Sequence, residues 1–321
     1  MGVVSRYFPR FDPLITGIIT ALFVGLLIPV SAGAVHFLSH AADVGVALVF
    51  LLYGMRLSTR EVLRGLTNIR LQGFILAATF LIFPLLSWGL SVLAEPLIGR
   101  DFALGILFLG LLPSTVQSSV TFVSIARGDI ASAIAAATVS NIAGMFITPA
   151  LVVAFMDMSG ASTGGFSAVL TNLLLPFIIG QCLQPWFGDW IRARRHLTRR
   201  SDTGAIILVV LAATLSATAD GAWSVVTPLS LLVLVAVLVA LLSAMLAITW
   251  FGAQRLPREE RIVALMCGSK KSLATGLPMA KALFPTNMVG TIGIPVIIFH
   301  QIQLVVCAAI ARILASATER D

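Results

Sequence analysis

Apolar residues run through this chain in long stretches that polar residues, prolines and glycines interrupt only briefly. About 20 apolar residues in a row are enough for a helix to cross the hydrocarbon core of a bilayer. Ten apolar stretches, several of them interrupted by Pro or Gly, can be marked: Leu14–Val30, Asp43–Met55, Leu71–Leu93, Phe102–Ala126, Ile130–Phe155, Phe166–Trp186, Thr203–Ala219, Ser224–Phe251, Arg261–Leu283 and Val289–Leu314. The pattern therefore predicts an all-α integral membrane protein with ten transmembrane helices.

The composition agrees with a membrane protein and excludes other classes. Of 321 residues, 58% are hydrophobic and only 11% are charged, whereas soluble domains carry about 25% charged residues. The net charge of +7 does not indicate nucleic acid binding, because the basic residues lie in short gaps between apolar stretches. The three cysteines have no Cys-x-x-Cys spacing, which excludes a disulfide framework and a thiolate metal site.

The basic residues also orient the predicted helices. If the N-terminus is cytoplasmic, Arg100 is the one basic residue in an outer loop, and Lys270, Lys271 and Lys281 lie within the ninth stretch. The rest of the 21 Lys and Arg residues then lie in cytoplasmic segments. The positive-inside rule thus predicts that both termini are cytoplasmic. We expect a multi-pass protein of the plasma membrane, which in a bacterium is the inner membrane.

Ten helices divide into five and five at the loop 156–165, which is rich in Ser, Thr and Gly. Because five is odd, the second half must be inverted relative to the first. This predicts two inverted five-helix repeats, at 13–155 and 166–316. Inverted repeats are typical of secondary transporters, whose sites lie at the membrane midplane where helices are discontinuous.

The fourth helix of each half carries signals for a break. The first lies in Leu112–Ser119 and the second in Cys267–Pro278, and each contains proline and several serines. A proline kink explains either cluster alone, but two at corresponding positions favour a paired site. Unwound backbone at this depth has free N–H and C=O groups that bind ions or polar side chains. The side chains expected to line such a site are Gln117, Ser118, Ser119, Ser269 and Ser272. His300, in the tenth helix, is either a residue of the transport pathway or a buried histidine with internal partners.

Several motifs together resemble the bile acid:sodium symporter superfamily. They are the serine pair of the fourth helix, Ala126-Arg127-Gly128-Asp129 after it, Thr138-x-Ser140-Asn141 with Thr148-Pro149 in the fifth, and Gly268-Ser269-Lys270-Lys271-Ser272 in the ninth. The resemblance covers nearly the whole chain and is greatest to the subgroup that contains the seventh human member of solute carrier family ten. It implies a core domain in which helices four and nine cross, and a panel domain of helices one, two, six and seven. It also adds Thr138, Ser140 and Asn141 to the candidate binding residues.

The resemblance implies sodium coupling, but most of the sodium ligands are absent. Sodium-coupled members use a Ser-Asn pair in helix four, hydroxyls in helix five, a Gln in helix three, and a Glu and a Gln four residues apart in helix nine. An ungapped alignment places Ser118 and Ser119, Ala133 and Ala137, Thr79, and Met266 and Lys270 at these positions. Ser118, Ser119 and Thr79 are the sodium ligands that remain, so sodium is doubtful, and we expect no other cofactor.

Two lysines stand at this depth instead. A lysine at the bilayer centre costs about 2.5–3.5 kcal/mol on insertion scales, and Lys270 is too far along the helix from Arg261 to reach the cytoplasmic headgroups easily. Neighbours on a helix point about 100° apart, so at most one of Lys270 and Lys271 faces the crossing directly. Its ammonium group either takes the place of a sodium ion or loses its proton during transport.

The sequence predicts a secondary transporter that moves a small organic anion, such as a bile acid, a steroid conjugate or another carboxylate, by alternating access. Two alternatives stay open: a sodium-dependent organic anion symporter, and a non-transporting regulator or scaffold, for example of ion homeostasis. An enzyme is not expected. Gly160-Ala161-Ser162-Thr163-Gly164 matches a nucleophile elbow but lies in the predicted linker, without the strand that this motif requires.

Overall fold

The computed structural model describes residues 13–28, 30–56, 68–156, 173–221, 223 and 226–317. Throughout these ranges the regular structure is helical, and they contain no strand. The predicted linker 156–165, apart from Met156, and the beginning of the sixth predicted helix lie outside the described residues.

The helices follow the apolar stretches. Their bounds are α1 (Pro13–Leu27), α2 (Ala32–Arg56), α4 (Ile69–Ala77), the π-helix η2 (Ala78–Ile82), α5 (Phe83–Ile98), α6 (Arg100–Leu111), α7 (Gln117–Ile125), α8 (Ile130–Phe155), α10 (Leu175–Ala193), α11 (Arg195–Ala219), α12 (Pro228–Gly252), α13 (Arg258–Gly268), α14 (Leu273–Leu283) and α15 (Thr286–Ala317). The predicted starts at Asp43 and Thr203 are wrong, since α2 and α11 begin earlier. A helix continues through polar residues that meet water or a polar partner, so counting apolar residues places its start too late.

Six described helical segments are long and apolar enough to cross a membrane: Ala32–Arg56, Ile69–Ile98, Ile130–Phe155, Thr198–Ala219, Pro228–Gly252 and Thr286–Ser316. Large apolar side chains such as Leu81, Leu93 and Leu232 are exposed on the outside of the helix assembly. Apolar surface on this scale is stable only in contact with lipid or another protein. The protein is therefore a multi-pass membrane protein.

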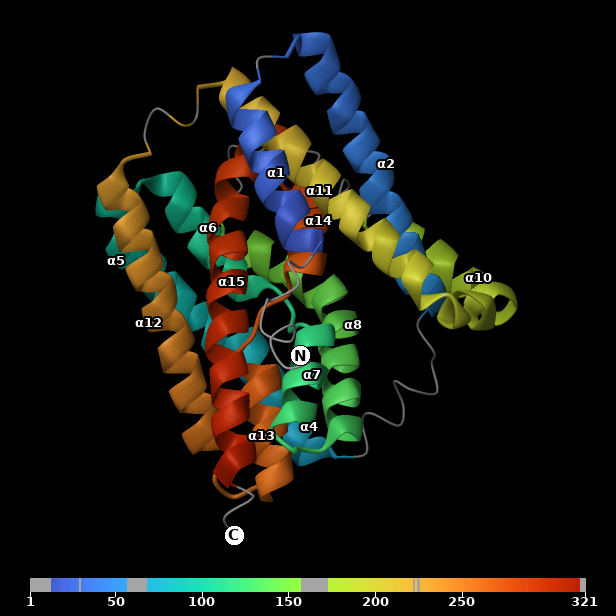
Figure 1. Ribbon diagram of the computed structural model, residues 1–321, viewed down its shortest axis with the longest axis vertical. Helices are drawn as coiled ribbons and strands as arrows, with labels where there is room; N and C mark the ends of the chain where they lie inside the picture. The colour runs from blue at the N-terminus through green and yellow to red at the C-terminus, as the bar shows by residue number, and fades with distance from the viewer. Residues whose placement is uncertain are drawn as a thin grey trace, which may run out of the picture.

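The helices form two groups (Figure 1). We call α1, α2, α10 and α11, which pack on one another, the panel group, and the remaining helices the core group. Glycines allow α2 and α10 to touch: a Cβ on Gly54 would collide with Phe177 O, and one on Gly180 would collide with Leu51 O. Any larger residue would force these two helices apart, so the glycines set the spacing within the panel group.

Both predicted breaks are present, but they are shorter than predicted. The chain leaves helical geometry between α6 and α7, and again between α13 and α14. Ser118 and Ser119 lie in the first turn of α7, and Pro278 lies inside α14. In Figure 1 the half-helices α6 and α14 lie in the upper part of the molecule, and α7 and α13 lie below them. The two breaks therefore lie between these upper and lower halves.

Candidate functional site

The break between α6 and α7 is held by polar side chains of α8. The Ser114 N–H donates to Ser140 Oγ at 3.0 Å, and Asn141 Nδ2 donates to Ser114 O at 2.7 Å. Two turns further along α8, Thr148 Oγ1 donates to Leu111 O at 2.7 Å. Unwound backbone inside a membrane requires such partners. Ser140 and Asn141 therefore support the break, and Thr138 makes none of these contacts.

The two breaks bind directly to one another. The Ser272 N–H donates to Pro113 O at 2.9 Å, Ser114 Oγ donates to Cys267 O at 2.5 Å, and Ser119 Oγ donates to Met266 O at 3.0 Å. All the side chains in these bonds are buried. Backbone groups freed in one broken helix are thus satisfied by the other.

Within the second break, each serine has a separate role. Ser272 caps α14, because its Oγ accepts a hydrogen bond from the Thr275 N–H at 3.2 Å. Ser269 Oγ donates back to Leu265 O at 2.6 Å, in the preceding turn of α13. Both predicted serines therefore bond to backbone of their own segment in this conformation.

The side chain of Lys271 reaches the C-terminal end of α6. Its Nζ donates to Thr79 O and Gly110 O, each at 2.8 Å, and to Leu112 O at 2.6 Å. The Phe83 ring lies 4.2 Å from the same nitrogen. The last carbonyls of a helix lack partners within it and carry the negative end of the helix dipole. An ammonium group at this position satisfies both the hydrogen bonds and the charge.

The π-helix η2 explains why Thr79 O is free for Lys271. The Phe83 N–H, which would bond to Thr79 O in an α-helix, donates to Ala78 O instead. The next residue, Pro84, has no N–H to take its place. The π-helix and the proline together leave one buried carbonyl that Lys271 satisfies.

Lys270 points to a different place. Its Nζ is buried with no hydrogen-bond partner among the described residues, and it lies 4.5 Å from the centre of the Phe122 ring. The thiols of Cys267 and Cys307 lie in the same region. An unpaired buried ammonium group is costly, so Lys270 and Lys271 are in very different chemical environments.

Gln303 of α15 binds the backbone of Lys271 on both sides. Its Oε1 accepts from the Lys271 N–H at 2.9 Å, and its Nε2 donates to Lys271 O at 2.8 Å. The same Nε2 lies 2.8 Å from His300 Nδ1. His300 is therefore connected to the second break through Gln303. Sequence reasoning missed Gln303, although a lone amide within an apolar stretch is a usable signal.

The serine pair of α7 divides into a buried and a more open residue. Ser119 is buried against α13, whereas Ser118 is half-buried and its Oγ lies 3.2 Å from Thr115 Oγ1. Gln117, at the start of α7, is exposed. Ser118 and Gln117 are therefore the members of this cluster that a ligand from outside the core group can reach.

The described residues contain no group of three or more His, Cys, Asp or Glu side chains that could hold a metal ion. Of the three remaining sodium ligands, Ser119 is bonded to α13, and Thr79 supplies its carbonyl to Lys271. The buried Thr79 Oγ1 has no hydrogen-bond partner among the described residues. None of the described contacts joins Thr79 to the serine pair. The cation best accommodated here is the protein's own Lys271.

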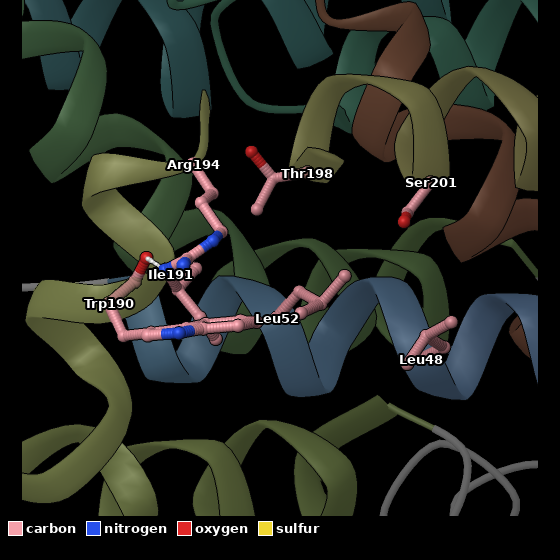
Figure 2. Close-up of a pocket in the computed structure, with 7 residues that line it drawn as sticks. All are labelled: Leu48, Leu52, Trp190, Ile191, Arg194, Thr198 and Ser201. Atoms are coloured by element: carbon pink, nitrogen blue, oxygen red, sulfur yellow. Dashed lines mark hydrogen bonds between the residues drawn. The ribbon is translucent and has the colours of Figure 1, made fainter. Parts of the chain in front are cut away.

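A separate apolar pocket lies within the panel group (Figure 2). Arg194 stacks on the Trp190 ring at 4.1 Å along one wall of this pocket. The lining residues, Leu48, Leu52, Trp190, Ile191, Arg194, Thr198 and Ser201, come from α2, α10 and α11 and the residue between the last two. None of them belongs to the two breaks, so this pocket is not part of the candidate site.

Known proteins are similar to this chain over nearly its full length. The model of the SBF-like CPA transporter family matches residues 12–316. The chain is 39% identical over 311 residues to the uncharacterized protein PA2026 of Pseudomonas aeruginosa, covering 95% of this chain and 93% of that protein. It is 36% identical over 323 residues to the putative symporter YfeH of Escherichia coli (strain K12), with 98% and 96% covered. It is 25% identical over 315 residues to sodium/bile acid cotransporter 7 of Danio rerio, with 95% and 93% covered.

Proposed function

We propose that this chain, which belongs to the SBF-like CPA transporter family and is a membrane transporter, moves a small organic anion. Transport is proposed to proceed by alternating access and without obligatory sodium coupling. The anion is proposed to be a carboxylate of the bile acid or steroid-conjugate type. A bile acid appears in the name of the Danio rerio relative.

The observation that carries the sodium-independent proposal is the position of Lys271. Its ammonium group is bonded by three backbone carbonyls at the end of a broken helix, which is the kind of place where transporters coordinate coupling cations. A sodium ion beside this fixed charge would be repelled, and the repulsion is strong where the effective dielectric constant is low. Lys271 is thus proposed to supply the charge that sodium supplies in other transporters.

Lys270 is proposed to carry the proton. Its Nζ has no hydrogen-bond partner in the described structure and lies against Phe122. A neutral amine is accommodated in such an environment at much lower cost than an ammonium ion. A lysine that gains and loses its proton between the two faces of the membrane couples transport to the proton gradient.

The anion is proposed to bind at the two breaks, beside the start of α7. Ser118 and Gln117 are accessible there, and the free N–H groups of a helix start favour negative charge. Ser119, Ser140, Asn141, Ser269 and Ser272 shape this region through the backbone bonds described above. We also propose Thr138, two residues before Ser140 on α8, and His300, which contacts Gln303, as binding residues.

We also propose the ten-helix arrangement of two inverted repeats, at 13–155 and 166–316, with both termini cytoplasmic. The fourth apolar segment of each proposed repeat is split into two half-helices, α6 with α7 and α13 with α14. In both cases the halves meet at the other repeat's break. This correspondence supports the proposal that the repeats arose from one structural plan.

Uptake into proteoliposomes tests this function. Radiolabelled cholate is the first probe, followed by other organic carboxylates, with sodium chloride compared with choline chloride at constant ionic strength and pH. We expect equal uptake in both salts and a dependence on pH that Lys270→Met removes. Uptake that rises steeply with external sodium would contradict this proposal and favour a sodium-dependent symporter. If no organic anion is taken up by well-folded protein, the scaffold alternative gains support.

A further inference from the structure

Lys281 lies in the last turn of α14, where the core group meets the panel group. Its Nζ is 3.2 Å from Asp43 Oδ1 and donates hydrogen bonds to Ser39 Oγ at 2.8 Å and to Thr286 Oγ1 at 2.7 Å. The side chain of Lys281 is only 4% exposed, whereas that of Asp43 is 46% exposed. The lysine is therefore fixed and buried, and the aspartate is the member of the pair that can leave.

The four residues of this cluster come from both groups. Ser39 and Asp43 are one turn apart on α2 of the panel group, whereas Lys281 and Thr286 belong to α14 and α15 of the core group. Among the ion pairs of the described residues, this one joins the two groups. Movement of the panel group away from the core group therefore breaks it.

Close to this cluster, small residues of α15 and α11 meet. A Cβ added to Gly290 of α15 would lie 3.0 Å from Ala213 O and 3.1 Å from Ala217 Cβ, both on α11. The polar contacts that resist separation here are those of Lys281 with Asp43 and Ser39 of α2.

Separation leaves Lys281 with Thr286 alone among these partners, and a buried ammonium group without a counterion is strongly unfavourable. Asp43 keeps a polar neighbour on its own helix, because His40 Nδ1 lies 3.9 Å from Asp43 Oδ2. The site that opens on the core group needs another anion, and Asp43 shows which chemistry fits it.

We propose that Lys281 and the Thr286 hydroxyl form a carboxylate-binding site that Asp43 occupies in this conformation. A carboxylate of the transported anion takes this place when the panel group moves away, as a second position on its path, separate from the one proposed beside the start of α7. The identity of that anion rests on the proposed function, whereas the site itself rests on the contacts above. Exchange of Asp43 for the substrate offsets the loss of the ion pair, so substrate binding favours opening.

Thiol labelling of the purified full-length protein in nanodiscs tests this site. The reporter is Ala217→Cys in a Cys182→Ser background, because Ala217 is buried where α11 meets α15. Asp43→Ala and the closer mimic Asp43→Asn should each raise the rate of maleimide labelling several-fold. Sodium acetate should slow the labelling of the Asp43→Ala variant in a saturable way, because acetate is small enough to take the space of the missing Asp43 carboxylate beside Lys281 in the closed conformation. Equal sodium chloride should not slow it. This acetate effect should be absent when Lys281→Met is added.

Asp189→Ala is the matched control, because Asp189 pairs with Arg192 of the same helix and joins no two groups. It should leave the labelling rate unchanged. Size-exclusion chromatography and circular dichroism confirm that each variant is folded. Labelling of both Asp43 variants at the parent rate would show that the Lys281–Asp43 pair does not hold the two groups together. Acetate that has no effect, or that has the same effect with Lys281→Met, would overturn the carboxylate-binding site. A Lys281-dependent acetate effect in a protein that takes up no cholate would contradict the proposed function and leave this site standing.

Discussion

Lys270 and Lys271 are adjacent in the sequence, but their amino groups lie in different environments. Lys271 completes the hydrogen bonds of three carbonyls, and Lys270 bonds to none in the described structure. The consequence of losing a buried polar group depends on what it leaves behind, since each orphaned partner costs roughly 1–3 kcal/mol. The two lysines should therefore respond to substitution in opposite ways.

Lys271→Met should destabilise the protein by several kcal/mol, because Thr79 O, Gly110 O and Leu112 O lose their donor. Lys270→Met should leave the stability unchanged or raise it, because an apolar side chain of similar length replaces an unpaired amine. Thermal unfolding of the detergent-purified variants measures both effects. Equal destabilisation by the two substitutions would show that the described contacts do not distinguish them.

The two serines at the start of α7 should also respond differently to substitution. Ser119→Ala removes a buried bond to Met266 O and should cost about 1 kcal/mol of stability. Ser118→Ala should leave the melting temperature unchanged and reduce cholate uptake, because its half-buried hydroxyl is open to ligand. Thr121→Ala serves as the control, since Thr121 is exposed on the same helix and bonds to Gln117 O. Normal uptake by the Ser118→Ala variant would exclude Ser118 from the binding site.

At the scale of elements, α8 is the support of the first break, and its start is fixed by Asp129. The Asp129 carboxylate accepts from the Ala131 N–H at 2.9 Å and from the Ser132 N–H at 3.1 Å. A hydrogen bond from the Ser132 hydroxyl, reinforced by these two N–H groups, holds the pKa of Asp129 below its usual value despite partial desolvation. A well-fixed start keeps Ser140 and Asn141 in register with Ser114.

Asp129→Ala should lower the stability at neutral pH by about 1 kcal/mol, the usual effect of losing an N-cap. Asp129→Asn should lose less, since asparagine also caps helices. Because the folded-state pKa is lowered, the contribution of Asp129 is complete above its unfolded pKa of about 3.9 and disappears as the pH falls through the folded value. Melting temperatures of the wild type and the Asp129→Ala variant should therefore converge in strong acid. A difference that persists unchanged there would contradict the capping role.

At the scale of the whole molecule, the proposed inverted repeats require a fixed orientation in the membrane. Reporters fused after Arg200 and after Arg258 should read cytoplasmic, and those at Thr163 and Thr286 should read external, because the basic residues lie almost entirely on one side of the predicted topology. Enzyme-fusion or cysteine-accessibility mapping in cells provides the measurement. A cytoplasmic Thr163 would remove the basis for the inverted second repeat.

Much of this molecule follows from the sequence alone. Long apolar stretches predict membrane helices wherever lipid is the solvent, since a bilayer accepts only apolar side chains and hydrogen-bonded backbone. The positions of both breaks follow from proline, glycine and serine clusters, because such residues interrupt helices through local conformational preference. The motifs of the fourth, fifth and ninth stretches also indicate the family, which the comparison confirms over residues 12–316.

Only the tertiary structure decides what each polar residue does. The sequence places Lys270 and Lys271 at one depth but cannot say which carbonyls each reaches, because Thr79, Gly110 and Leu112 are far away along the chain. It likewise contains no sign that Asp43 of α2 meets Lys281 of α14. Local preferences act over a few residues and determine the helices and their breaks, whereas hydrogen bonds and ion pairs between broken helices arise only when packing brings distant segments together.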